Sequence, residues 1–159
     1  MRDKRFVAEH RGGPLKKEQH RQLINWACDC IENVFPLLGN NYDDRLKNAL
    51  MVARAWAFDK TTVGDTRNAS VNAIAVANES SDPVTIAVAR AVGHAVATAH
   101  MADHSLGSAI YALKAVKSAG GSVDAEREWQ NEHLPYEVRE LILSIRSLKE
   151  QGFKDLREE

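Results

Sequence analysis

Three histidines and one aspartate lie within a short stretch of the sequence, namely His94, His100, Asp103 and His104. Imidazole and carboxylate groups are common ligands of metal ions such as zinc. On one continuous helix, His100 and His104 would lie about 40° apart around the axis, so both could bind one ion. His94 would lie about 120° from His100 and about 80° from His104, a poor position for a third ligand. The spacing allows a metal site but does not specify one, and no H-E-x-x-H or C-x-x-C pattern accompanies it.

The same four side chains could have a structural role instead. Asp103 could cap a helix that begins there, with His104 in its first turn. His94 and His100 would then donate hydrogen bonds to neighbouring helices from within a crowded core. A third interpretation is that the histidines contact a partner or respond to pH, because histidine titrates near neutrality.

A second group of candidates contains three arginines and a tryptophan: Arg45, Arg54, Arg67 and Trp56. Each arginine has an aspartate or another acidic residue close by in the sequence, which is typical of salt bridges on or between helices. The alternative is that Arg54 and Trp56 anchor an interface, because arginine and tryptophan often dominate binding energy.

The chain contains two cysteines, Cys28 and Cys30. Two positions apart on a helix, they point about 200° apart and cannot form a disulfide with each other. We therefore expect reduced thiols that act as small apolar fillers in a cytoplasmic protein. No motif typical of a thiol nucleophile surrounds either residue.

The elements that position these residues are predicted to be helices. Apolar residues recur three and four apart along most of the 159-residue chain, and no segment alternates as a strand would. We expect an all-α fold, a compact array of about seven helices around an alanine-rich central helix at about 83–102. A single domain is expected over residues 1–150, opening with an extended lead-in over 1–13, and a charged, frayed tail over 151–159. Three helices are expected over about 14–35, 63–79 and 83–102, and one is expected to run from 122 or 124 to 133. The other three are expected to start at 43 or 44, at 103 and at 135.

The charge and hydropathy patterns exclude two classes of partner. The formal net charge of -1 gives no electrostatic reason to expect nucleic-acid binding. The start of the chain lacks the apolar core of a signal peptide. The stretch 83–102 has the length of a membrane span, but it contains Arg90 and two histidines. It is also rich in alanine, which contributes little to membrane transfer, so we expect a buried helix and no membrane association.

Four segments resemble one known family: WACDCIENVFPLL (26–38), DDRLKNALMVARAWAFD (43–59), GDTRNASVNAIAVAN (64–78) and ARAVGHAVATAHMADHSLGSAIYALKAV (89–116). The last segment is the longest and the most specific. Together they are similar to the putative immunity protein family of bacterial polymorphic-toxin systems, over roughly residues 1–150. The positions that match the family's motifs are Trp26, Asp44, Arg45, Arg54, Trp56, Arg67, Gly93, His94, His100, Asp103, His104, Leu106 and Gly107.

The resemblance implies an all-α cytoplasmic protein that binds and neutralises a co-encoded toxin. It implies no reaction and no cofactor, and its partner would be a protein toxin. One alternative is a small metal-dependent enzyme that uses the histidine and aspartate cluster. The other is a helical scaffold or self-associating module, for example a homodimer.

Overall fold

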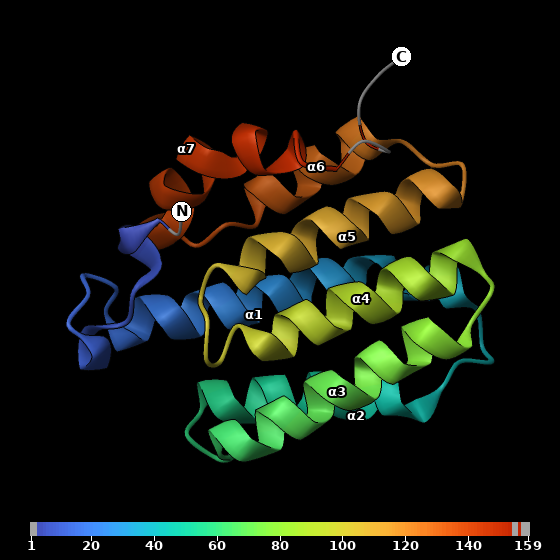
Figure 1. Ribbon diagram of the computed structural model, residues 1–159. Helices are drawn as coiled ribbons and strands as arrows, with labels where there is room; N and C mark the ends of the chain where they lie inside the picture. The colour runs from blue at the N-terminus through green and yellow to red at the C-terminus, as the bar shows by residue number, and fades with distance from the viewer. Residues whose placement is uncertain (1–2, 154–155, 157–159) are drawn as a thin grey trace.

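The computed structural model describes residues 3–153 and residue 156 (Figure 1). Over these residues the chain forms α1 (Lys17–Val34), α2 (Asp44–Ala57), α3 (Val63–Glu79), α4 (Pro83–Ala97), α5 (His104–Ser118), α6 (Val123–Glu132) and α7 (Tyr136–Glu150). Three short 3-10 helices are η1 (Lys4–Phe6), η2 (Glu9–Arg11) and η3 (Phe35–Leu38). The described residues contain an isolated bridge between Ala8 and Leu15 but no β-strand. The expected all-α fold is confirmed.

Local hydrogen bonds explain why several helices begin where they do. A capping box is present at the start of α3, where Thr62 Oγ1 accepts from Asp65 N at 3.0 Å and Asp65 Oδ2 accepts from Thr62 N at 3.3 Å. Asp43 caps α2, and Asp82 caps α4 by accepting from Thr85 N at 3.1 Å. These side chains satisfy backbone N–H groups that have no partner inside the helix.

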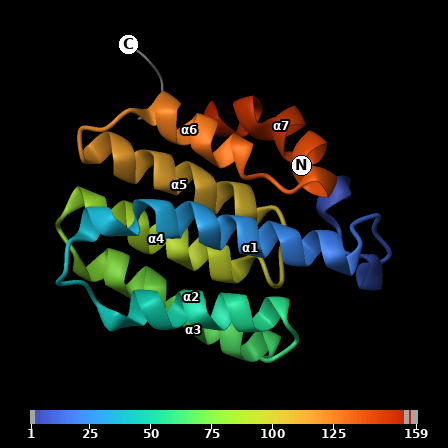
Figure 2. The same ribbon diagram turned by 180° about the vertical axis from the view of Figure 1, so that it is seen from behind.

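The helices pack in layers around α4. The pair α2 and α3 forms one side of the molecule, α4 and α1 lie in the middle, and α5 lies between α4 and the pair α6 and α7 (Figures 1 and 2). Helix α4 contacts α1, α2, α3 and α5. Its small side chains allow this close approach, and residues from Ala87 to Ala97 supply most of its buried face. The expected central position of the alanine-rich helix agrees with these contacts.

The central helix is shorter than expected, because it ends at Ala97 and not at about 102. Beyond Thr98 the backbone forms hydrogen bonds between residues three apart, as in a 3-10 turn. His100 N, for example, donates to Ala97 O at 3.2 Å. Thr98 Oγ1 also donates to His94 O at 3.0 Å. A threonine hydroxyl that bonds to the preceding turn competes with the regular helix. The prediction that the central helix continues through His100 to about residue 102 is therefore wrong.

Helix α5 begins one residue after the expected start, at His104. Asp103 occupies the N-cap position, but its side chain makes no capping hydrogen bond. Its backbone has helical torsion angles (φ −68°, ψ −14°), whereas a capping residue usually has an extended backbone. The expected capping role of Asp103 is therefore wrong, while the expected position of His104 in the first turn is confirmed.

The N-terminal segment folds back onto the helices, contrary to the extended lead-in expected. Phe6 and Leu15 are buried in a hydrophobic cluster with residues of α1, α5 and α7. Gly13 permits the tight return, because a Cβ atom there would lie 2.1 Å from Val7 O. Burial of Phe6 and Leu15 offsets the conformational cost of ordering this segment.

The predicted charged tail lies partly outside the described residues. Of the part described, Phe153 and Leu156 pack against the same hydrophobic cluster as Phe6. The ring of Phe153 meets Tyr111 edge-on, with 5.3 Å between the ring centroids. Within residues 3–153 and 156, none of the helices combines the length and apolar character that crossing a membrane requires.

Candidate functional site

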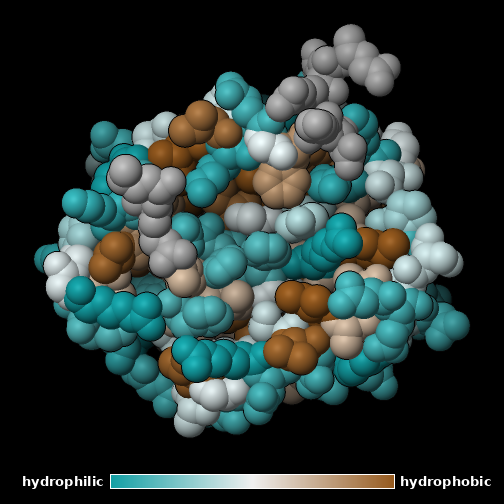
Figure 3. Space-filling model, viewed as in Figure 1, coloured by the Kyte–Doolittle hydropathy of each residue, from teal (hydrophilic) through white to brown (hydrophobic). Residues whose placement is uncertain are grey.

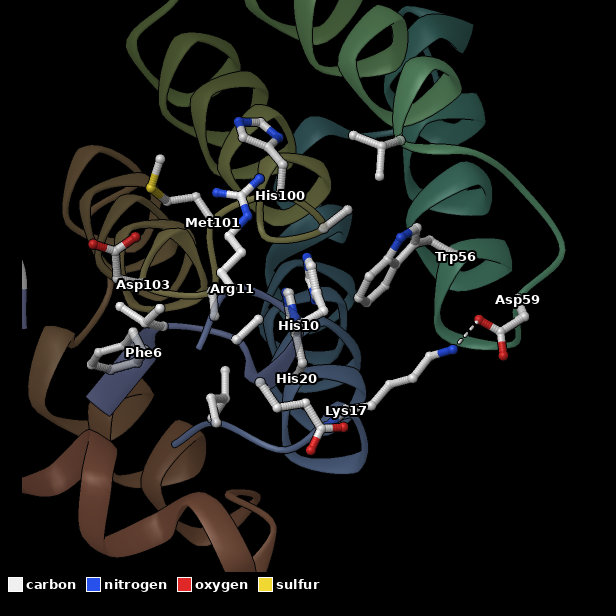
Figure 4. Close-up of a pocket in the computed structure, with 17 residues that line it drawn as sticks. Phe6, His10, Arg11, Lys17, His20, Trp56, Asp59, His100, Met101 and Asp103 are labelled. Atoms are coloured by element: carbon white, nitrogen blue, oxygen red, sulfur yellow. Dashed lines mark hydrogen bonds and ion pairs between the residues drawn. The ribbon is translucent and has the colours of Figure 1, made fainter. Parts of the chain in front are cut away.

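A cavity of about 430 Å³ lies where the N-terminal segment meets α1, α2 and the turn between α4 and α5 (Figure 4). We call it the His100 cavity. It brings together three residues that the sequence singled out, namely Trp56, His100 and Asp103. It also includes His10, Arg11 and His20, which sequence reasoning missed. A cavity of this size accommodates a small molecule or a protruding side chain.

His20 forms the inner wall of the cavity and holds the turn between α4 and α5. Its side chain is buried, and Nε2 lies 2.5 Å from Thr98 O. The His20 ring also packs on Trp56, with 4.7 Å between the centroids. Burial lowers the pKa of His20, so the ring is neutral near pH 7 and its Nε2–H donates a hydrogen bond to Thr98 O.

One end of the cavity is closed by an ion pair. Lys17 Nζ lies 3.0 Å from Asp59 Oδ1, and Arg21 bonds to the other carboxylate oxygen. Figure 4 shows the Lys17 side chain extending along the cavity to Asp59 at its edge. The hydrogen bond from Lys17, together with the positive charges nearby, lowers the pKa of Asp59. The charges at this end therefore compensate one another.

The three predicted histidines do come together, but from three different elements. His94 lies on α4, His100 in the turn and His104 on α5. His94 Nδ1 lies 2.9 Å from His104 Nδ1, and the His100 and His104 centroids are 6.0 Å apart. Of the three, His100 lines the His100 cavity. In the part of the chain that the structure describes, no group of three or more His, Cys, Asp or Glu side chains is placed to hold a metal ion.

Packing around His94 explains the glycine at position 107. The ring of His94 stacks on Tyr111 with 5.2 Å between the centroids. A Cβ atom at Gly107 would lie 3.0 Å from His94 Nδ1, so a larger residue would push against the ring. Burial lowers the pKa of His94 to about 4, and the neighbouring His104 contributes to the same shift. His94 therefore packs as a neutral side chain at pH 7.

Two of the three predicted arginines make salt bridges between helices. Arg45 Nη2 lies 2.8 Å from Asp43 and 2.9 Å from Glu79, which ties the start of α2 to the end of α3. Arg54 Nη2 lies 2.6 Å from Asp29, which ties α2 to α1.

Arg67 is different from Arg45 and Arg54. It is exposed on α3, and its guanidinium makes no hydrogen bond or ion pair with the described residues. The salt bridge expected for Arg67 is therefore not found in residues 3–153 and 156, whereas those expected for Arg45 and Arg54 are.

Residues 13–137 match the model of one protein family, which is described as "Imm-5 like putative immunity protein". The chain belongs to this family. The match covers α1 to α6 and the beginning of α7, and it confirms the resemblance found in the sequence. No curated protein and no solved structure matches the chain.

A second hollow in this Imm-5 like protein lies on α2, within the matched residues. We call it the α2 groove; it has a volume of about 590 Å³, and its apolar lining includes Phe35, Tyr42, Met51 and Phe58. Met51 is 63% exposed and Phe58 is 67% exposed. Large apolar side chains this exposed are costly to hydrate, and when grouped they mark contact surfaces.

The two residues that the sequence suggested as one interface anchor, Arg54 and Trp56, lie in different hollows. Arg54 lines the α2 groove, whereas Trp56 lines the His100 cavity. The two side chains therefore serve different surfaces of the Imm-5 like protein. Arg54 is held by Asn25 O and Asn25 Oδ1, each 3.2 Å from Nη1, in addition to Asp29.

Apolar side chains on the face shown in Figure 3 are more dispersed. On the face formed by α3, α4 and α5, they appear as separate patches among hydrophilic residues (Figure 3). Single exposed apolar residues are normal on a folded protein. The α2 groove is distinguished by the association of exposed apolar side chains with a hollow.

Proposed function

We propose that this Imm-5 like protein binds a toxin encoded beside it and neutralises the toxin without catalysing a reaction. The observation that carries the proposal is membership of the immunity family over residues 13–137. The encounter is proposed to take place in the cytoplasm. Cys28 and Cys30, which are buried free thiols, support a reducing compartment.

The α2 groove is the proposed contact surface for the toxin. Aromatic residues and methionine are enriched where proteins bind one another, and Met51 and Phe58 already lie exposed here. Arg54 borders the groove and is held in one position by its bonds to α1. A side chain ordered before binding loses less entropy on association, which favours affinity.

The proposed mechanism is occlusion of the toxin's active site. An apolar side chain of the toxin would enter the groove and bury Met51 and Phe58, while Lys47 and Glu32 form a polar rim. The rim charges are of both signs, so they contribute orientation more than a strong attraction. The inhibitor loses no group in this mechanism and can be recovered unchanged from the complex.

The proposal is tested by expressing the neighbouring gene with and without this protein and measuring cell survival, together with binding of the two purified proteins. Phe58→Asp and Met51→Asp are expected to weaken binding at least tenfold, because each places a charge in a surface that must lose its water. Leu148→Asp is the matched control. Leu148 is 71% exposed on α7 and lies outside the residues that match the family.

Each possible failure contradicts a different part of the proposal. If the wild-type chain neither binds nor neutralises the product of the neighbouring gene, the immunity function is wrong. If the wild-type chain neutralises it and both groove variants do so equally well, the function stands and the α2 groove is the wrong surface. Turnover of the toxin into a modified product would contradict inhibition by binding alone.

A further inference from the structure

Basic side chains gather at the His100 end of the His100 cavity. Arg11 extends from the N-terminal segment towards His100 (Figure 4). The charged groups that act on the His100 ring are Arg11, Arg67 and His104, and all three are basic. Within residues 3–153 and 156, the guanidinium groups of Arg11 and Arg67 make no hydrogen bond or ion pair.

His100 has a polar atom that is buried without a partner. Its Nδ1 is shielded from solvent and makes no hydrogen bond within the described residues. Leaving a buried polar group unsatisfied costs about 1–3 kcal/mol, so such a group calls for a binding partner. A ligand that accepts a hydrogen bond from Nδ1–H, after the ring turns towards the cavity, would remove this cost.

The rest of the cavity favours a ligand with an apolar body. Its walls include Phe6, Leu15, Trp56 and Met101. Such walls gain most from a flat or aromatic group, because aromatic rings pack well against one another.

The acidic residues of the cavity are already engaged. Asp59 pairs with Lys17, and Glu9 Oε1 accepts from Lys17 N at 3.3 Å. Asp103 also has an interaction partner. In Figure 4 Asp59 lies at the Lys17 side of the cavity, away from His100, whereas Asp103 lies nearer to Arg11. Of these two carboxylates, Asp59 therefore contributes little repulsion to an anion at the His100 end.

We propose that the His100 cavity binds a small organic acid, with its carboxylate between Arg11 and His100 and its apolar body against Trp56 and Phe6. The planar guanidinium of Arg11 matches the two oxygens of a carboxylate. A rotation of the His100 ring would bring Nδ1, which is shielded from solvent in the structure, to the same group. Arg67 adds attraction from α3. The site does not depend on toxin binding, since it lies apart from the α2 groove.

The experiment titrates the purified full chain with benzoate, and with benzamide as an uncharged molecule of the same shape. Binding is measured by calorimetry and by changes in the NMR signals of the histidine rings. Benzoate is expected to bind with a Kd of about 1 mM or below and to shift the His100 signal, and benzamide to bind at least tenfold more weakly. The same weakening is expected for benzoate with Arg11→Gln, which removes the charge from an exposed side chain.

Arg90→Gln is the matched control, because Arg90 is exposed on α4 and does not line the cavity. It is expected to bind benzoate like the wild type, and all variants should keep the wild-type melting temperature. Equal affinities for benzoate and benzamide, or unchanged benzoate affinity in Arg11→Gln, would overturn the proposal. Binding of inorganic phosphate but not benzoate would also overturn it, since the site would then select another anion.

A separate measurement distinguishes a free organic acid from a carboxylate of the toxin. If benzoate does not bind but Arg11→Gln loses toxin neutralisation, the carboxylate belongs to the toxin and the small-molecule site is wrong. If Arg11→Gln loses benzoate and still neutralises the toxin, the two sites are independent, as proposed. If the wild-type protein fails to neutralise the toxin, the proposed function is wrong, but benzoate binding still tests the His100 cavity on its own.

Discussion

The Nδ1 atoms of His94 and His104 lie 2.9 Å apart, so one imidazole must donate a proton and the other must accept it. This arrangement requires at least one neutral ring. His94 is the more constrained of the two, since it also stacks on Tyr111 and lies against Gly107. Protonation of both rings would place two positive charges in contact inside the protein.

The free energy of unfolding should therefore decrease in acid through His94. Its pKa is about 4 in the folded protein, mainly because burial disfavours the charged ring and then because His104 is close. The unfolded value is about 6.5, so the unfolded chain binds more protons between about pH 4 and 6.5. His94 contributes full stability above this window and loses it as the pH falls, by at most about 1.4 kcal/mol per pH unit.

Urea unfolding at a series of pH values measures this contribution. His94→Phe keeps a ring on Tyr111 but cannot titrate, so its stability should change less with pH than that of the wild type. His20 also has a lowered pKa and adds a slope of the same sign in both proteins. His133→Phe is the control, because His133 is exposed. The same slope for wild type and His94→Phe would show that His94 does not titrate in this window.

Replacing Gly93 should overpack the contact between α3 and α4. A Cβ atom there would lie 2.9 Å from Ile74 Cγ1, and Ser70 Oγ donates to Gly93 O at 3.0 Å. We expect Gly93→Leu to reduce the free energy of unfolding by about 1–3 kcal/mol, or more. Adding Ile74→Ala should recover part of this loss, because Ile74 is the obstructing side chain. Gly64→Ala on α3, which has space, is the control, and a neutral Gly93→Leu would contradict the packing.

Removing the buried guanidinium of Arg146 should destabilise the contact between α6 and α7. Arg146 Nε donates to Glu150 at 2.9 Å, Nη1 donates to Asn131 at 2.8 Å, and Nη2 donates to Gln130. Arg146→Met leaves these partners buried without their donor, so we expect a loss of about 3 kcal/mol in urea unfolding. Arg139→Met, on the same helix but exposed, should change stability by less than about 0.5 kcal/mol. Similar effects of the two substitutions would show that the network contributes little.

The two cysteines should be unreactive in the folded protein. Both are fully buried, and burial raises the pKa of Cys28 to about 12 and that of Cys30 well above its usual value. The thiolate is the reactive form, so alkylation at pH 8 should be far slower in the native protein than in urea. Mass spectrometry of protein treated with iodoacetamide measures this difference. Rapid labelling without denaturant would indicate that α1 opens locally.

The sequence predicts helix starts well where the signal is local. Thr62 and Asp65 predict the beginning of α3 because their side chains bond to the backbone of the same turn. The end of α4 was missed for the opposite reason. No glycine or proline directly follows Ala97, and Thr98 O is bonded to His20 on α1, which lies 78 residues earlier in the chain. Such a contact leaves no pattern in the neighbouring sequence.

The candidate site shows the same division. Helix geometry pairs His100 with His104 and leaves His94 to one side, whereas the structure brings His94 into contact with His104, because the chain turns back between α4 and α5. The cavity beside His100 was not predicted, since one wall comes from η2 and another from Trp56 on α2. The wall from η2 is held in place by the burial of Phe6 and Leu15. Hydrophobic periodicity cannot detect this burial, because the N-terminal segment has no regular helix.

Helix α1 contributes to both hydrophobic clusters of the protein. Ile24 and Ile31 pack in the cluster around α4, whereas Leu23 and Trp26 pack in the one that includes α5 and α7. Trp26 Nε1 also donates to Gln130 O at 2.9 Å, which adds a link to α6. Loss of order in either cluster therefore removes part of the packing that holds α1 in place. The two halves should therefore unfold in one cooperative transition, and the slowest amide protons to exchange with deuterium should belong to the middle of α1.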